Sequence, residues 1–242
     1  GIGIAKYLGY SLDWTAAILG QLWVSTLQLS THFLNEYYNG PVDQFNPNRT
    51  PFSGGSGAIG PGKLSRQVAF FTSHPEALIC QTEEVWVRNG RRVNPGKRHR
   101  KRGGMIFEPS LDLCLVSPSA VMVRRELFER AGLFDESLPA CEDYDLWLRV
   151  SCRFPVHLIE TPLIVKRGGH ADQLSRAWGL DRYRIAALEK LLNSDILNPV
   201  QREAVQRVLQ RKCAVYAGGC RRRGRTEEAA HYERLAQKVS DE

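Results

Sequence analysis

The sequence predicts an α/β fold in which helices flank a mixed sheet. Residues Lys63–Ser73 repeat apolar side chains at helical spacing, and the following run Ala77–Val87 has the length and composition of a strand. The dipeptide Asn89-Gly90, a strong signal for a two-residue hairpin turn, joins that strand to Arg91–Val93. From Leu180 onward the pattern is only helical, which predicts a C-terminal helical hairpin.

The other elements follow in chain order. Strands are expected over Ala120–Val123, Phe154–Ile159 and Pro162–Lys166, and helices over Arg124–Ala131, Leu180–Ser194, Pro199–Ala217 and Thr226–Val239. Gly132 and Gly218-Gly219 are the expected ends of two of these helices. The last two helices have a tetratricopeptide-like spacing of Ala and Tyr. Because a solenoid needs several copies, this single copy predicts a packing appendage.

Length and composition are those of one large domain or two small ones. The chain has 242 residues, 43% of them hydrophobic, and a formal net charge of +7. Its six cysteines form no CxxC pair and show no zinc-like spacing, which favours reduced thiols. No cleavable signal peptide is visible. We therefore expect a cytoplasmic protein, and its association with a membrane depends on one segment.

Residues 14–35 contain no Asp, Glu, Lys or Arg. A helix of this length would cross a hydrocarbon core of about 30 Å. Several Gln, Ser and Thr side chains keep the segment only modestly hydrophobic, so packing against protein is equally compatible with it. Membrane contact through 14–35 and burial in protein both remain open interpretations.

The stretch Glu142–Arg149 places three carboxylates in the first turn of a predicted helix. One interpretation is purely structural, because acids in a first turn stabilise the positive end of the helix dipole by roughly 0.3–1 kcal/mol each. The alternative is that one carboxylate acts as a general base.

This stretch and the preceding segment Glu126–Glu136 resemble the second half of a family 2 glycosyltransferase of the GT-A type. The resemblance covers about residues 61–235. It implies a partial GT-A-like mixed sheet and the transfer, with inversion, of a sugar from a nucleotide-sugar donor to an acceptor hydroxyl. In that family one carboxylate of a Glu-Asp pair takes the proton from the attacking hydroxyl. By position this residue is Asp143, with Glu142 beside it.

The same resemblance implies further site residues and partners. Ser117-Pro118-Ser119 resembles the acceptor-side loop, so Ser117 and Ser119 are candidates for substrate binding. His170 resembles a histidine that faces the diphosphate or its metal, and Gln173 follows it, although a lone histidine is more often structural. The implied partners are a nucleotide sugar and a sugar or lipid-linked acceptor, and the implied cofactor is a divalent metal, Mg or Mn.

Residues 1–60 resemble a different family, the UbiA-type membrane prenyltransferases. The segment Asn35–Gln44 is similar to their first acidic motif, which holds the magnesium ions of a prenyl diphosphate. Carried over by position, Glu36 and Asp43 are metal ligands, whereas Asn39 stands where an aspartate is usual. The second acidic motif and the further membrane helices of that family have no counterpart later in the chain. A polar loop followed by a Gly/Ser linker is the other interpretation.

A basic run lies between Gly96 and Gly104. Its members are Lys97, Arg98, His99, Arg100, Lys101 and Arg102. A solvated loop is the first interpretation, and an anionic partner such as a diphosphate or a lipid head group is the second. No aromatic residue is interleaved in the run, so we expect no nucleic acid partner.

The predicted organisation has three parts: a prenyltransferase-like helical fragment with a Gly-rich linker (1–60), a glycosyltransferase-like half-domain (61–178) and a helical appendage (179–242). The nucleotide-binding half of a family 2 enzyme should precede Pro61 and is not found there. The hypotheses are therefore a glycosyltransferase, a relative that is inactive because this half is missing, a membrane-associated or basic binding module without catalysis, and a prenyltransferase fragment.

Overall fold

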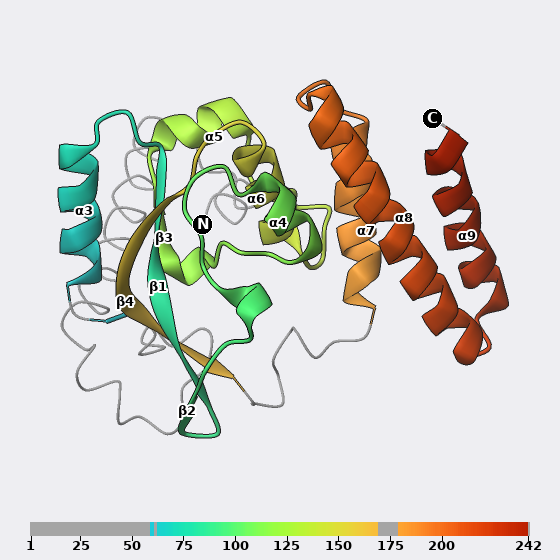
Figure 1. The fold of residues 1–242 in the computed structure, drawn as a ribbon, viewed down its shortest axis with the longest axis horizontal. Helices are drawn as coiled ribbons and strands as arrows, with labels where there is room; N and C mark the ends of the chain where they lie inside the picture. The colour runs from blue at the N-terminus through green and yellow to red at the C-terminus, as the bar shows by residue number, and fades with distance from the viewer. Residues whose placement is uncertain (1–58, 61, 169–178, 242) are drawn as a thin grey trace, which may run out of the picture. The chain divides into compact units, whose positions relative to one another are not determined.

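The computed structural model divides the chain into two units, Gly1–Pro61 and Gly62–Glu242. It describes residues 59–60, 62–168 and 179–241, and the fold below is that of the second unit (Figure 1). The predicted helix over 14–35 and its membrane contact lie outside the described residues. Among the residues that are described, no helix is both long and apolar enough to span a membrane.

Every strand of the four-stranded mixed sheet pairs with β1 (Ile79–Arg88). β4 (His157–Gly168) runs parallel to β1 along nearly its whole length. β2 (Arg91–Val93) and β3 (Val121–Val123) pair antiparallel with opposite ends of β1. Since all but one of the β1 residues that pair with them also pair with β4, β2 and β3 share the edge opposite β4. The predicted α/β class is confirmed.

The hairpin between β1 and β2 turns at the dipeptide that the sequence singles out. Asn89 and Gly90 have φ values of 49° and 75°. Positive φ at both central residues is the requirement of a type I′ turn, whose twist matches that of the flanking strands. The predicted hairpin is confirmed.

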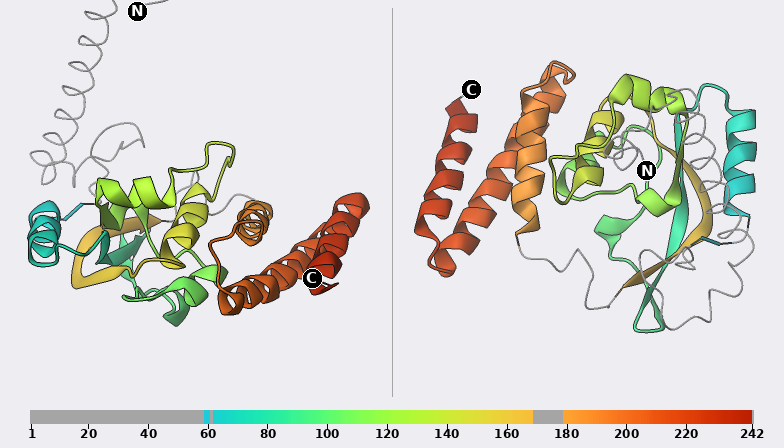
Figure 2. Two further views of the ribbon diagram at one scale, coloured as in Figure 1. Left: turned by 90° about the horizontal axis from the view of Figure 1, so that it is seen from above. Right: turned by 180° about the vertical axis from the view of Figure 1, so that it is seen from behind.

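Helices cover both faces of the sheet (Figures 1 and 2). On one face lies α3 (Lys63–Ser73), whose Phe71 packs in a small cluster with Ala77 and Cys80. On the other face lie three helices, α4 (Phe107–Asp112), α5 (Arg125–Ala131) and α6 (Glu142–Ser151). Burying apolar area between such layers supplies the main driving force for folding, at about 25 cal/mol per Å².

The helix α6 is packed on two sides. Its Tyr144 and Leu148 belong to a core cluster shared with the C-terminal helices, whereas Leu146 and Val150 belong to a cluster shared with α5 and the sheet. The Tyr144 hydroxyl also donates a hydrogen bond to the carbonyl of Leu111 at 2.5 Å. The position of α6 is therefore fixed from both sides.

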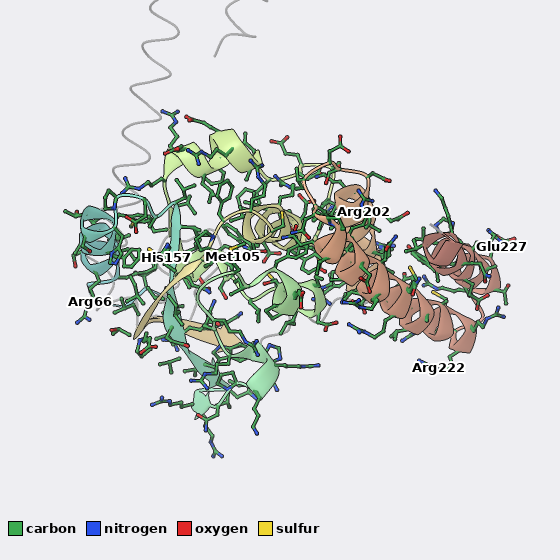
Figure 3. The ribbon with its side chains drawn as sticks, turned by 45° about the horizontal axis from the view of Figure 1, so that its top comes forward. Arg66, Met105, His157, Arg202, Arg222 and Glu227 are labelled. Atoms are coloured by element: carbon green, nitrogen blue, oxygen red, sulfur yellow. The ribbon has the colours of Figure 1, made fainter. Side chains whose placement is uncertain are left out.

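The C-terminal helices are α7 (Leu180–Leu192), α8 (Pro199–Arg222) and α9 (Thr226–Asp241). A capping box starts α8, with the side chains of Asn198 and Gln201 each bound to the backbone of the other. The hairpin of α8 and α9 is confirmed. Its turn lies between Arg222 and Glu227 (Figure 3).

Three details differ from the sequence-based predictions. The two strands predicted over 154–159 and 162–166 are one strand, because a bulge before Pro162 lets the ladder continue past a residue without an N–H. Gly218-Gly219 does not end α8, since packing of Cys220 in the core outweighs the low helix propensity of glycine. The short helix α4 was not predicted, because Pro109 interrupts its pattern.

Candidate functional site

The first turn of α6 separates its three carboxylates into different environments. Cys141, which precedes the helix, has a left-handed backbone with φ 64°. Glu142 is exposed, Asp143 is half-buried and Asp145 is buried. These three acids therefore have different chemical capacities, which the sequence alone does not reveal.

Asp145 is a structural residue. Its side chain is only 2% exposed and forms an ion pair with Arg149 at 2.7 Å and a second with Lys190 at 3.2 Å. Arg149 also donates to the backbone carbonyls of Ala131 and Leu133, at the end of α5. Asp145 thus ties α6 to its neighbours and is occupied by two cations.

Asp143 is the carboxylate with reactive potential. Its Oδ1 accepts the N–H of Tyr144 at 2.7 Å, and its Oδ2 accepts the Cys114 thiol at 3.7 Å. Burial raises the pKa of Asp143, and the nearby charge of Glu142 acts in the same direction against these hydrogen bonds. A raised pKa makes a carboxylate a stronger base, which suits it to accept a proton from a hydroxyl group.

The loop from Cys114 to Ser117 connects Asp143 with two lysines. Ser117, at the end of this loop, accepts hydrogen bonds from Lys101 at 3.0 Å and from Lys166 at 3.5 Å. Ser119 is exposed in the short 3-10 helix η2 (Pro118–Ala120). Of the two predicted acceptor-loop serines, Ser117 therefore contacts both lysines, in the loop whose Cys114 binds Asp143, and Ser119 faces solvent.

Both lysines surround a buried acid that sequence reasoning did not single out. We call Glu84, Trp86, Lys101, Ser117 and Lys166 the Glu84 cluster. The Lys101 ammonium lies 3.5 Å from Glu84 Oε2, and these two side chains are only 3% and 4% exposed. Lys166 lies 3.7 Å from Glu84 Oε1, which also accepts the indole N–H of Trp86 at 2.9 Å.

The burial of Lys101 corrects one prediction. The solvated-loop interpretation of the basic run is wrong for this residue, although Lys97, Arg98, Arg100 and Arg102 are exposed. The run begins with η1 (Lys97–His99) and turns its fifth basic residue inward. A charge within a predicted strand, as Glu84 is, was the available signal that a buried cation would be needed.

Opposing effects set the ionisation of the buried pair. Burial raises the pKa of Glu84, but attraction to Lys101 and Lys166 outweighs it, so the pKa of Glu84 lies below its ordinary value. Burial lowers the pKa of Lys101, and repulsion by Lys166 adds to this, whereas Glu84 opposes it. We regard the pair as charged at neutral pH, because each ion faces the other at close range.

The other predicted site residues lie outside the described part of the chain. These are His170, Gln173, Glu36 and Asp43. Within residues 62–168 and 179–241, no three His, Cys, Asp or Glu side chains come together as a metal site. The described residues thus contain no group of three such donors for the implied Mg or Mn.

Comparisons with known proteins give limited support. No protein-family model matches the chain. A segment of 62 residues, 26% of the chain, is 31% identical to uncharacterized glycosyltransferases of Rickettsia felis and Rickettsia conorii. It spans only 10% of the length of these curated relatives.

Among solved structures there is a partial likeness. The solved structure of S. aureus TarS in complex with UDP-GlcNAc is similar with a TM-score of 0.46 and 16% identity, over 64% of this chain and 45% of that one. A likeness at this level carries no functional argument. Part of the chain is thus glycosyltransferase-like in sequence, and the family 2 and prenyltransferase resemblances stay predictions.

Proposed function

We propose that residues 62–241 provide the acceptor side of a glycosyltransferase, with Asp143 as the general base. The observation that supports this most is the state of Asp143: half-buried, at the start of a firmly packed helix and with a raised pKa. In the proposed step, its carboxylate takes the proton of an acceptor hydroxyl. The hydroxyl oxygen attacks the anomeric carbon of a nucleotide sugar with inversion, and the bond to the diphosphate breaks with its electron pair.

The other two carboxylates of the helix start are less suited to this role. Asp145 is held by two cations. Glu142 is exposed, and its charge acts on Asp143 by raising the pKa of that residue. Glu142 is therefore proposed as a residue that tunes the base.

The remaining substrate contacts belong to the same proposal. Ser117 and Ser119 would meet the acceptor, and His170 and Gln173 would meet the donor diphosphate, as the family resemblance implies. A divalent metal, Mg or Mn, would help the diphosphate to leave.

Substitution of the base tests the proposal. The chain is incubated with a panel of nucleotide sugars and Mn, with and without simple sugar acceptors, and the release of nucleoside diphosphate is measured. Asp143→Asn should lower turnover at least about 100-fold, because a general base contributes 10²–10⁴-fold. Glu129→Gln, which likewise replaces a carboxylate by an amide at an exposed position of α5, is the matched control and should keep full activity.

Two outcomes would contradict the assignment. If Asp143→Asn turned over as fast as Glu129→Gln, Asp143 would not be the base. If no donor were turned over while changes in residues 97–102 abolished binding of an anionic ligand, the chain would instead be a basic binding module without catalysis. The observation that favours this second function is the exposure of the arginines in that run, which could attract an anion.

A further inference from the structure

The two lysines of the Glu84 cluster are held very differently. Lys101 is enclosed, and it donates to the Leu115 carbonyl at 3.3 Å and to Ser117 at 3.0 Å. Lys166, on β4, has a side chain that is 45% exposed, and its contacts to Glu84 and Ser117 are long, at 3.7 and 3.5 Å. Lys166 is therefore the ammonium group that can turn toward solvent without breaking the buried pair.

The charges of the cluster do not cancel among themselves. Glu84 carries one negative charge and faces two ammonium groups, one from inside and one from the solvent side. Lys101 alone neutralises Glu84, so the charge of Lys166 is in excess. The positive charge of Lys166 also acts on Asp143, whose pKa it lowers.

A further positive group, Arg98, is linked to the cluster through His99 and Trp86. The Lys166 ammonium stands 4.9 Å from the ring centre of Trp86, and the ring of His99 stands 5.2 Å from the same indole. Arg98 donates to the imidazole of His99 at 3.3 Å. Burial lowers the pKa of His99, and the charges of Arg98 and Lys166 lower it further. Both positive charges thus act on the same imidazole, and an anion bound near it would be attracted to both.

We propose that Lys166, together with Arg98, binds a phosphate group over the buried Glu84–Lys101 pair. In the free protein Lys166 rests on Glu84 and Trp86. On binding, its ammonium turns to the phosphate while Lys101 continues to neutralise Glu84. Trp86 then loses its cation–π contact, which makes its indole a reporter of binding.

The phosphate has two chemical sources under the proposed function. It is either the diphosphate of the sugar donor or a phosphate carried by the acceptor. Which of these molecules carries the phosphate depends on the proposed function. The binding of the phosphate itself can be measured without sugar transfer. Lys166 reaches Ser117, and Cys114 of the same loop binds Asp143, so either source would lie near the proposed base.

The test uses inorganic pyrophosphate as the probe. Binding is measured by titration calorimetry at low and physiological salt, and in parallel by tryptophan fluorescence. Lys166→Met should weaken binding about tenfold, because it removes a charge-assisted hydrogen bond. Lys97→Met is the matched control, since it makes the same exchange at an exposed position of the basic run, next to Arg98. It should bind pyrophosphate as the unchanged chain does.

The fluorescence measurement tests the role of Trp86, and competing ligands identify the source of the phosphate. Trp86→Phe should bind pyrophosphate but lose the fluorescence change, because Trp86 is the expected reporter. Uridine diphosphate and glycerol 3-phosphate are each tested as competitors of pyrophosphate. Tighter binding of uridine diphosphate would identify the sugar donor as the source. The reverse order of affinities would identify a phosphorylated acceptor. Both orders support the site.

Three results would overturn the inference: no pyrophosphate binding by the unchanged chain, equal weakening by Lys97→Met and Lys166→Met, or a fluorescence change that persists in Trp86→Phe. Equal weakening would mean a diffuse charge attraction in place of a built site. Asp143→Asn separates the two proposals, because it should lower transfer at least about 100-fold and leave pyrophosphate binding intact. If sugar transfer depended on Asp143 but pyrophosphate binding did not depend on Lys166, the phosphate site would be refuted and the proposed function would stand.

Discussion

The buried Glu84–Lys101 pair permits a prediction of stability with a worked magnitude. Lys101→Met leaves the Glu84 carboxylate in a place where its side chain is only 4% exposed and where its Oε2 has no hydrogen-bond partner among the described residues. Breaking a buried pair by removing one partner typically costs about 3–5 kcal/mol. Lys166 and the Trp86 indole still contact Oε1, so we expect the lower end, about 3 kcal/mol.

Thermal and urea unfolding measure this loss. At about 2–4 °C per kcal/mol for a chain of this size, Lys101→Met should lower Tm by roughly 6–12 °C. Lys97→Met, exposed in the same segment, should change the free energy of unfolding by less than about 0.5 kcal/mol. The double variant Lys101→Met/Glu84→Gln should recover much of the loss, because it no longer buries an unpaired charge.

The pH dependence gives an independent check. In the unchanged chain the pKa of Glu84 is lowered, so its charged form contributes stability above the ordinary Glu pKa, and this contribution is lost as pH falls through the folded value. In Lys101→Met the largest opposing attraction is removed, so burial should raise that pKa in spite of Lys166 and the Trp86 indole. The deficit of the variant should therefore shrink in acid. A deficit that is independent of pH, or a variant as stable as Lys97→Met, would refute the reasoning.

Three further predictions concern α6. Asp143→Asn should raise the free energy of unfolding at pH 7, because burial raises the pKa of Asp143 and makes its charge unfavourable; the gain should disappear below the ordinary Asp pKa, and a loss at pH 7 would contradict it. Tyr144→Phe removes the hydrogen bond to the buried Leu111 carbonyl and should cost about 1–3 kcal/mol in urea unfolding; equal stability would contradict this. Arg149→Met leaves the buried Asp145 with one cation and should cost about 2–4 kcal/mol in thermal unfolding, and a change below about 0.5 kcal/mol would refute its structural role.

Local signals in the sequence were sufficient where one element determines its own structure. The bounds of α3 and β2 match the prediction, and α6 begins at Glu142, where the acidic turn predicts a helix start. Gly132 ends α5 with a φ of 79°, as a glycine stop requires. Periodicity failed at β4, because whether a proline breaks a strand or sits in a bulge is decided by the partner strand.

The candidate site was predictable only in part for a related reason. The role of Asp143 could be proposed from the sequence, but its burial depends on the loop that carries Cys114. Lys101 stands in a run of exposed cations, and nothing within that run distinguishes it. What distinguishes it is Glu84 on β1, which only the three-dimensional fold brings within 3.5 Å.

The pairing of every strand with β1 has a consequence for how the protein folds. The hairpin of β1 and β2 is local and can form within microseconds, whereas β4 must return from about eighty residues further along the chain. At 5–20 residues per second, Lys166 leaves the ribosome roughly 4–16 s after Glu84. Throughout that interval one edge of β1 has no strand to pair with, and the proposed phosphate site is incomplete. Binding at this site should therefore report completion of the sheet, and a chain stopped before β4 should expose the β1 edge to chaperones and to aggregation.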